Sequence, residues 1–415
     1  MTDYDDLFAE TAASDSLFVD KRALDPLREP DEIVARSEQQ QQVARLLNGV
    51  HEGYLPTTVS IYGPPGTGKT VTTRRVCGEF AARTETFAVE YVNLKECRSL
   101  FSAANEIHLE LTGTKRGAYE GLDGVFEGIW EALEAYPEWT VLILDEIDHI
   151  QHDSNYDPND FFYRLLRGEG KLKRDLNLSV FLVSNELLEV DLRLDSRVKS
   201  AMDGEEVFFP PYGVALLERI LRPRIEQAFR DGAVPDAVFE YGVREAARRW
   251  GDVRKALRLF RQAGETATER GLEAVTRECL DATIETTGKE AVTEKLLALP
   301  FNHFLVLTGV TGWTERPSGE IKQPVTTSEV VASLHQQNLA EEFLLSERAV
   351  RELVTDLETM GLVDTWVDSR GREGRVKQIE TSFDPQWVRD VLERYVAETE
   401  QVDPESVLAD PDVGS

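Results

Sequence analysis

The segment GPPGTGKT combines glycines, a lysine and a threonine at the spacing of a loop that binds phosphate groups. It follows the apolar run TVSIY and precedes a helical pattern, which is the context that such a loop requires. Successive backbone N–H groups can point at phosphate oxygens there, and the N-terminal dipole of the helix adds positive potential. A lysine charge reaches the β- and γ-phosphates, and a threonine hydroxyl is a ligand for Mg²⁺. The expected nucleotide-binding residues are Gly63, Pro64, Pro65, Gly66, Thr67, Gly68, Lys69 and Thr70.

A second apolar run, VLILD, ends in Asp145 and is followed directly by Glu146. In an open parallel sheet, a side chain at the carboxyl end of a strand lies beside the phosphate loop. Asp145 is therefore expected to hold Mg²⁺ through water, and Glu146 to orient and deprotonate the attacking water. Together with the loop, the pair predicts binding and hydrolysis of ATP with Mg²⁺.

Hydrolysis also requires groups that meet the charge of the transition state. Asn185 ends the next β-rich run and is a candidate to position the water, although a turn asparagine would look the same. Arg197, with Arg193 and Lys199 nearby, is placed to reach the nucleotide of a neighbouring protomer; the alternative is a surface ion pair. Arg254 lies in the first turn of a helical segment and is a candidate sensor of the γ-phosphate.

Other residues that bind metals or form disulfides give weaker patterns. His149 and His152 have a spacing that suits a metal ion on a helix, but the surrounding segment is loop-like and offers no third ligand. Cys77, Cys97 and Cys279 are far apart and show no CxxC spacing. We therefore expect buried thiols and no zinc site or disulfide framework.

The segment SRGREGRVK concentrates cations in a chain whose formal net charge is -30. It lies between two β-type runs and follows three helical segments of residues 290–396, and the last two of these helices with the hairpin have the order of a winged helix-turn-helix. Glycines let the backbone approach DNA closely, and arginines suit a narrow minor groove. A hairpin turn charged only for solubility is the alternative. The expected DNA-binding residues are Arg348 and Arg351 on the second helix, and Arg370, Gly371, Arg372, Arg375 and Lys377 on the wing.

Capping patterns define the two helices before this wing. Thr326 and Glu329 have the spacing of a capping box, and Ser346 is a plausible N-cap of the second helix. Gly361 is expected to end that helix.

The elements that must position these residues indicate three folded regions. Residues 31–211 alternate β-rich runs with helical segments, which predicts a parallel sheet covered by helices on both faces. Residues 212–289 show helical periodicity alone and predict a helical domain, and residues 290–396 predict the winged helix. An acidic extension over 1–30 and an acidic disordered tail over 397–415 flank them. The expected fold class is an α/β P-loop ATPase domain with a helical lid, followed by a winged helix-turn-helix.

Charge is the strongest compositional signal, with 76 acidic against 46 basic residues. The acid is spread along nearly the whole chain, which favours a protein of a molar-salt cytoplasm, where a Debye length of about 3 Å screens self-repulsion. An ordinary acidic cytosolic protein is the alternative. The N-terminal residues lack the pattern of a signal peptide, and no apolar run approaches the roughly 18 residues that span a bilayer. These features predict a cytoplasmic, nucleoid-associated protein.

Taken in order, the motifs resemble those of the archaeal relatives of the origin recognition complex and the cell-division-cycle helicase loader, a replication-initiator family of AAA+ ATPases. GPPGTGKT and LILDEID resemble its Walker A and B motifs, SNE its sensor 1, RLDSRVKS its arginine-finger box, FPPY its lid entry, and GDVRKALRLFRQAGETA its sensor 2. The resemblance covers about residues 17 to 395.

The resemblance implies roles for individual residues. Arg197 becomes a finger that acts on a neighbouring protomer, Arg254 a sensor 2, and Tyr212 of FPPY a nucleotide contact. Where the family usually carries a His-Arg pair near the adenine, this chain has Ala35 and Arg36, so only Arg36 is expected to keep that role. Family members also insert an element of the ATPase domain into DNA, for which the candidates here are Lys115 and Arg116.

The implied function is a slow, switch-like ATPase that binds double-stranded origin DNA, recruits the replicative minichromosome maintenance helicase and acts with further initiator protomers. Two alternatives remain open at this level. One is an AAA+ ATPase that acts on protein partners, of the clamp-loader or motor type. The other is an ATP-switched DNA-binding regulator, or a paralogue without origin activity.

Overall fold

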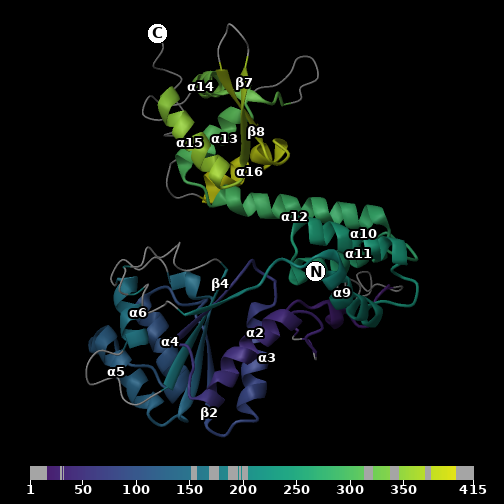
Figure 1. The fold of residues 1–415 in the computed structure, drawn as a ribbon. Coiled ribbons are helices and arrows are strands. Elements are labelled where there is room, and N and C mark those ends of the chain that lie inside the picture. Colours follow the sequence, from purple (N-terminus) through teal and green to yellow (C-terminus); the bar gives the residue numbers. More distant parts are fainter. Residues whose placement is uncertain are drawn as a thin grey trace, which may run out of the picture. The chain divides into compact units, whose positions relative to one another are not determined.

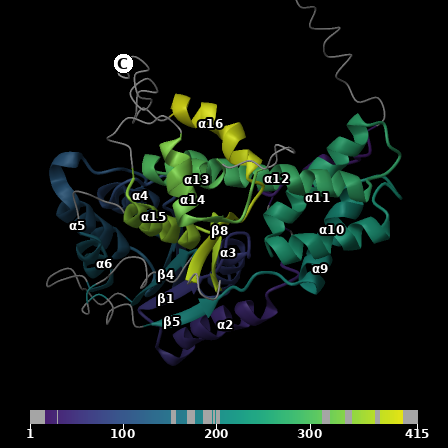
Figure 2. The same ribbon diagram turned by 90° about the horizontal axis from the view of Figure 1, so that it is seen from above.

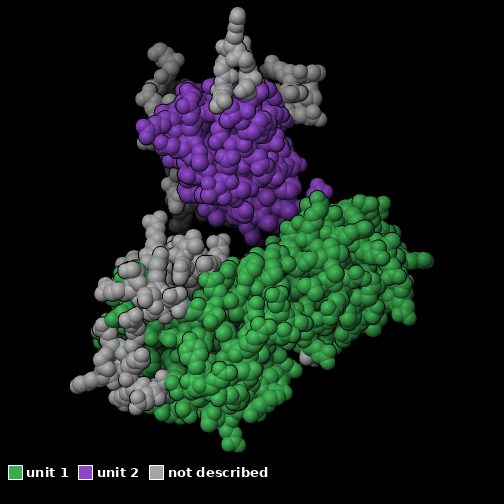
Figure 3. Space-filling model, in the orientation of Figure 1, with its two compact units in different colours: residues 1–281 green, residues 282–415 purple. Residues whose placement is uncertain are grey.

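The computed structural model describes residues 16–28, 30, 32–150, 157–167, 177–185, 195, 198, 204–312, 321–336, 345–369 and 375–398. The chain forms two compact units, residues 1–281 and 282–415, which Figure 3 shows in different colours. Each unit has its own hydrophobic core. The boundary falls inside helix α12 (Arg277–Leu297), so the helices that precede α12 belong to the same unit as the sheet.

A five-stranded parallel sheet forms the centre of unit 1, in the order β2-β3-β4-β1-β5. Strand β3 is paired on both sides and all of its residues are buried, which explains its uninterrupted apolar run. Four strands match the β-rich runs TVSIY, FAVEYVNL, TVLILD and LSVFLVSN of the sequence, whereas β5 was not predicted. The bounds are β1 (Thr58–Tyr62), β2 (Phe87–Asn93), β3 (Trp139–Asp145), β4 (Asn177–Ser184) and β5 (Glu205–Phe208).

Helices cover both faces of this sheet, as predicted (Figure 1). On one face, α2 (Ser37–Asn48) and α3 (Lys69–Ala81) pack against β1 through residues such as Val43, Leu47 and Cys77. On the other face lie α4 (Leu100–Thr112), α5 (Gly121–Leu133) and α6 (Pro158–Arg167). The described residues also contain the short 3-10 helices η1 (Lys21–Leu24), η2 (Gly49–Glu52), η3 (Ala118–Glu120) and η4 (Ile147–Ile150).

A helical bundle completes unit 1 (Figures 1 and 2). It consists of α9 (Val214–Ala228), α10 (Asp236–Arg249), α11 (Val253–Glu269) and the first part of α12. The N-terminal segment packs on this bundle, because Phe18 forms a β-bridge with Phe229 and their ring centroids lie 4.6 Å apart. Residues 16–28 are therefore part of the folded unit, whereas the sequence predicts an acidic extension over residues 1–30.

Gly264 of α11 makes the contact with these two rings possible. A Cβ atom at this position would lie 2.6 Å from both Phe18 Cζ and Phe229 Cε1. Gly264→Ala is therefore expected to destabilise the protein by about 1–3 kcal/mol through overpacking, despite alanine's higher helix propensity. Gly78→Ala in α3 is the matched control, because a Cβ there meets nothing within 4 Å, and it should stabilise by up to about 1 kcal/mol. Chemical denaturation of both variants measures the effect, and the same sign for both would contradict the packing.

Unit 2 has the order of a winged helix, with two elements beyond those predicted. Helices α13 (Phe301–Val310), α14 (Thr327–His335) and α15 (Glu347–Thr359) precede the hairpin of β7 (Val363–Ser369) and β8 (Arg375–Thr381). The two-residue strand β6 (Val325–Thr326) joins this hairpin in a sheet of order β6-β8-β7. Helix α16 (Gln386–Glu398) follows, and its Tyr395 stacks on Phe304 in the core. Neither β6 nor α16 was expected.

The predicted caps of unit 2 are confirmed. The Thr326 side chain accepts a hydrogen bond from the Glu329 backbone N–H, and the Glu329 carboxylate accepts one from the Thr326 backbone N–H. Ser346 caps α15 by accepting from the backbone N–H of Ala349 at 3.2 Å. Gly361 follows the end of α15 with a φ of 68°, which favours glycine.

Candidate nucleotide-binding site

The phosphate loop joins β1 to α3 at the carboxyl edge of the sheet. Gly66 and Gly68 have φ angles of 71° and 86°, a conformation that other residues rarely adopt. Both also lie close to other parts of the unit: a Cβ on Gly66 would be 1.8 Å from Asp252 Oδ1, and one on Gly68 would be 2.7 Å from the Tyr212 hydroxyl. Glycine at these two positions is thus required by backbone conformation and by the close approach of neighbouring elements.

Lys69, the first residue of α3, directs its amine back into the loop. Its Nζ donates hydrogen bonds to the carbonyl oxygens of Gly63 at 2.6 Å and Pro64 at 3.1 Å, and to Asn185 Oδ1 at 3.3 Å. Burial lowers the pKa of this amine, while the neighbouring carboxylates of Glu146 and Asp145 act in the opposite direction. The amine is thus held at the strand ends, where a phosphate would meet it.

Asp145 is surrounded by hydroxyl groups. Its Oδ2 accepts hydrogen bonds from Thr70 Oγ1 and from the Tyr91 hydroxyl, both at 2.8 Å, and its Oδ1 accepts from the backbone N–H of Glu146 at 3.0 Å. Tyr91 belongs to the neighbouring strand β2 and was not singled out in the sequence. Burial and the Asp145 charge raise the pKa of Tyr91 to about 12, so it stays a neutral donor.

The Thr70 and Asp145 oxygens fit a hard cation such as Mg²⁺, which prefers oxygen ligands and takes most of the others from water and phosphate. Across the described part of the chain, no three His, Cys, Asp or Glu side chains gather as a metal site of their own. His152 lies outside the described residues, and the His149 side chain is not described either, so their pairing is not tested.

Asn185 follows β4 and lies beside Lys69. Its backbone N–H and its side-chain Nδ2 donate to the same oxygen of Asp148, Oδ2, at 3.2 and 2.9 Å. Asp148 belongs to η4 and was likewise not singled out in the sequence. Asn185 is therefore held between a carboxylate and an ammonium group, at the position where the sequence places a water-orienting residue.

The N-terminus of α11 contacts the phosphate loop directly. Asp252 caps the helix by accepting from the backbone N–H groups of Arg254 at 2.7 Å and Lys255 at 3.2 Å, and the backbone N–H of Val253 donates to the Gly66 carbonyl at 3.3 Å. The Arg254 guanidinium lies 3.9 Å from the Asp252 carboxylate. The helical bundle thus brings Arg254 beside the loop, and its contact with the γ-phosphate stays a prediction.

Arg36 stabilises the loop from the side of the N-terminal segment. Only 4% of it is exposed, and its guanidinium carbon lies 3.8 Å above the centroid of the Tyr212 ring. It donates to the carbonyl oxygens of Thr67 at 2.9 Å and of Pro210. Arg36 and Tyr212 therefore meet at the loop, and their direct contact with a nucleotide stays a prediction.

A cavity of about 550 Å³ connects these groups, a size typical of small-molecule sites. Its lining includes the charged residues Lys69, Asp145 and Glu146, and the lid contributes Arg254. Apolar residues of the N-terminal segment and the lid also line it, namely Leu27, Ile33, Val34, Ile220, Pro223 and Leu257. A ligand that carries both a polyphosphate and an aromatic base matches this composition.

Some predicted site residues cannot be placed. Arg193, Arg197 and Lys199 lie outside the described residues, as do Arg370, Gly371, Arg372 and Gly374 of the wing. Arg375 opens strand β8, but its side chain is not described.

The described cations of the candidate DNA surface are paired with carboxylates of α15. Arg348 Nε lies 3.0 Å from Glu352, and Arg351 pairs with Glu347. Lys377 of the wing lies 3.3 Å from Glu358, which also accepts from the Thr365 hydroxyl at 2.6 Å. The hydrogen bond from Thr365 is the main cause that lowers the pKa of Glu358, and Lys377 lowers this pKa further.

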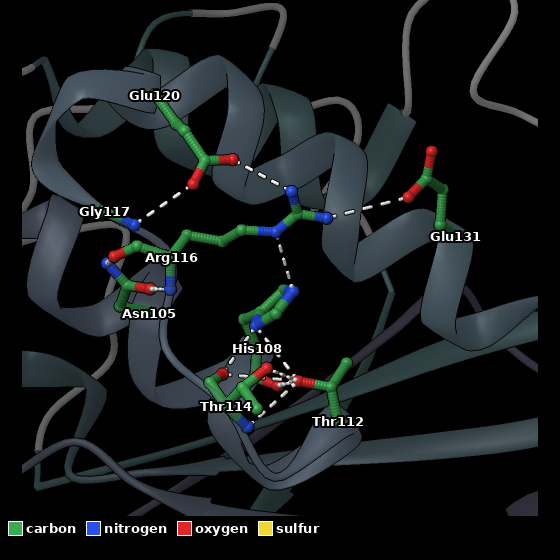
Figure 4. A network of polar contacts seen from close by, with 8 residues as sticks. All are labelled: Asn105, His108, Thr112, Thr114, Arg116, Gly117, Glu120 and Glu131. Carbon is green, nitrogen blue, oxygen red and sulfur yellow. Dashed lines mark hydrogen bonds and ion pairs between the residues drawn. The ribbon is translucent and has the colours of Figure 1, made fainter.

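Lys115 and Arg116 also have partners. Lys115 Nζ lies 2.7 Å from Glu106. Figure 4 shows Arg116 at the centre of a network between α4 and α5, donating from Nε to His108 Nε2 at 3.2 Å. Its other guanidinium nitrogens lie 2.9 Å from Glu120 and 3.7 Å from Glu131 (Figure 4). Arg116 thus holds the connection between two helices, and a DNA contact by either cation stays a prediction.

Comparison with known proteins places these features in a family. Residues 32–171 match the model of the AAA ATPase domain, and residues 218–285 match the Cdc6 AAA+ ATPase-type lid domain. ORC1-type DNA replication protein 1 of Methanosarcina acetivorans is 32% identical over 404 residues, which covers 94% of this chain and 93% of the relative. The ORC1-type DNA replication protein of Pyrococcus horikoshii is 30% identical over 406 residues, with coverage of 94% and 93%.

Solved structures agree. The Aeropyrum pernix ORC1 protein in complex with DNA is similar with a TM-score of 0.67 and 28% identity, over 92% of this chain and 98% of that one. The Aeropyrum pernix ORC2 protein, solved with ADPNP and ADP, shares the fold with a TM-score of 0.62 at 21% identity, over 92% of this chain and all of that one. In the described residues, no helix has the length and apolarity needed to cross a membrane.

Proposed function

Since the chain belongs to the family of ORC1-type DNA replication proteins and is an AAA+ ATPase, we propose that it initiates replication by binding origin DNA under the control of ATP. The observation that carries the proposal is the convergence of Lys69, Asp145, Asn185 and Arg254 on one cavity. These residues come from four separate segments, and together they supply the cation, the carboxylate and the polar groups that phosphoryl transfer requires.

The site residues divide the work of ATP hydrolysis among themselves. Lys69 binds the β- and γ-phosphates in place of its present carbonyl partners, and Glu146 orients and deprotonates the attacking water. Arg254 and Asn185 contact the γ-phosphate region from the lid and from β4. Bound Mg²⁺ supplies positive charge for the phosphate oxygens, and Thr70 and Asp145 are the residues that would hold it. Arg197 of a neighbouring protomer is proposed to supply the remaining positive charge that stabilises the transition state.

The DNA contacts are proposed for unit 2. The Aeropyrum relative was solved with DNA, and unit 2 of this chain has the helices and hairpin of a winged helix. We assign Arg348 and Arg351 of α15 to one groove, and the wing arginines with Lys377 to the flanking groove. The replicative minichromosome maintenance helicase and further initiator protomers are the proposed protein partners.

Genome-wide crosslinking and immunoprecipitation of the tagged full-length protein tests this function in its own cells. We expect sharp peaks that coincide with replication starts mapped independently by marker frequency. An untagged strain supplies the background. Peaks only at promoters would favour the ATP-switched regulator instead, and a profile without peaks would favour an ATPase that acts on proteins.

A further inference from the structure

Asp148 lies at the site, and only one of its two carboxylate oxygens has hydrogen-bond partners in the described part of the chain. Its Oδ2 accepts both hydrogen bonds from Asn185, one from the backbone and one from the side chain. Its Oδ1 is buried and has no hydrogen-bond partner in the described part of the chain. A buried charged oxygen without a partner is costly, so a residue that keeps one invites a functional explanation.

The core fixes the position of Asp148. Glu146 adopts a φ of 56°, which turns the chain sharply after β3. The short helix η4 then anchors itself through Ile147 and Ile150, both fully buried in the core beneath α5 and α6. Asp148 lies between these two anchors and is held at the end of β4. Its carboxylate is thus placed by packing that does not involve the nucleotide.

This placement determines which way the Asn185 amide points. With Nδ2 directed at Asp148, Oδ1 faces the Lys69 ammonium at 3.3 Å. A flipped amide would set its oxygen against the Asp148 carboxylate and its NH₂ group against the Lys69 ammonium, which are two repulsive contacts. Asp148 and Lys69 therefore select one orientation, which leaves the second Nδ2 hydrogen as the remaining donor of the amide.

We propose that Asp148 is a positioning residue for ATP hydrolysis, which orients the Asn185 amide so that its remaining N–H donor meets the attacking water or the γ-phosphate. The inference rests on the function proposed above, because it acts through Asn185. Asp148 itself does not line the nucleotide cavity, whereas Asn185 does. Its effect is therefore expected on the rate of hydrolysis and not on the affinity for ATP.

Full-length Asp148→Ala, Asn185→Ala and the double variant test this in single-turnover hydrolysis of Mg²⁺-ATP, with the ATP dissociation constant measured in parallel. Asp148→Ala should slow hydrolysis by about 10- to 100-fold while ATP binding changes by less than about threefold. The double variant should be no slower than Asn185→Ala, because both substitutions remove the same interaction. Asp148→Asn keeps an acceptor for Asn185 Nδ2, so its hydrolysis rate should fall less than that of Asp148→Ala. It also replaces the alanine variant as the test if that variant fails to fold.

Asp160→Asn is the matched control, because it removes one carboxylate from an exposed position on α6 and should leave hydrolysis unchanged. If the fold losses of hydrolysis rate in the two single variants multiply in the double variant, Asp148 acts independently of Asn185. That result would overturn the inference. A slow Asn185→Ala with a normal Asp148→Ala would overturn it as well, while leaving the proposed role of Asn185 intact. Normal hydrolysis by Asn185→Ala would instead contradict both the proposed role of Asn185 in hydrolysis and the inference about Asp148.

Discussion

Replacing Lys69 with alanine is expected to weaken ATP binding by at least about 100-fold. Lys69 is only 8% exposed, and its amine already makes three hydrogen bonds to neutral oxygens at the strand ends. Negatively charged phosphate oxygens are stronger acceptors, and a hydrogen bond between charged groups contributes roughly 1.5–3 kcal/mol. Two such bonds correspond to about 3 kcal/mol or more, which is at least a hundredfold in the dissociation constant. Calorimetric titration of the purified protein with Mg²⁺-ATP measures the change.

Lys95→Ala is the control for this substitution. Lys95 is exposed, follows β2 and carries the same charge, but it does not line the cavity. It should bind ATP as the wild type does. Because Lys69 also bonds to the Gly63 and Pro64 carbonyls, the melting temperature of both variants must be compared to separate loss of the ligand contact from loss of the loop. A folded Lys69→Ala protein with an ATP affinity within threefold of wild type would place the triphosphate elsewhere.

The sheet could be predicted because its central strands are buried on both faces. Strand β3 contains the apolar run VLIL, whose short length and β-branched residues favour a buried strand over a helix. Strand β5 was missed because it is a short edge strand in which only Val207 is buried. Helix α16 was missed despite a usable signal, since Val388, Val391 and Tyr395 recur at helical spacing.

The site residues that the sequence revealed are those whose chemistry is contiguous in the chain, such as the phosphate loop and the Asp145–Glu146 pair. Tyr91 and Asp148 were missed because their roles arise only from tertiary pairing. The parallel pairing of β2 with β3 sets Tyr91 opposite Ile143, from where its hydroxyl reaches Asp145. The turn at Glu146 brings Asp148 into hydrogen-bond contact with Asn185. A tyrosine in a strand and an aspartate in a loop are too common to be assigned a role without these contacts.

The charge pattern of unit 2 bears on how it binds DNA. Every described candidate cation of α15 and the wing already pairs with a glutamate, so DNA phosphates must displace carboxylates and not only water. The attraction from phosphate neutralisation is reduced accordingly, and in molar salt it is largely screened. If the protein works in such a medium, its binding to DNA must rest on contacts with the groove itself. We therefore propose that the glycine-spaced arginines of the wing carry the greatest weight.

The combined substitution of Arg370, Arg372 and Arg375 with alanine is therefore expected to lower the affinity for origin DNA by at least about 100-fold. Three groove contacts at about 1 kcal/mol or more each are sufficient for a loss of this size. The salt dependence of binding distinguishes phosphate contacts from groove contacts. If the arginines only neutralise phosphates, the slope of the logarithm of the DNA-binding constant against the logarithm of the salt concentration falls in magnitude by about 0.9 for each arginine removed. The loss of affinity would then fade in high salt. Because we assign them to the groove, the loss should persist when binding is measured by fluorescence anisotropy in molar salt.

A control with the same change of charge separates local contact from the general field of the protein. Arg244, Arg258 and Arg270 are exposed arginines of the helical bundle, and replacing all three with alanine also removes three positive charges. This variant should bind DNA within a few-fold of wild type at low salt and identically at high salt, where the long-range field is screened. If both triple variants lost affinity equally, net charge would govern binding. If the wing variant bound normally, the winged helix would not be the DNA anchor of this protein, and contacts of the ATPase unit would have to take that role.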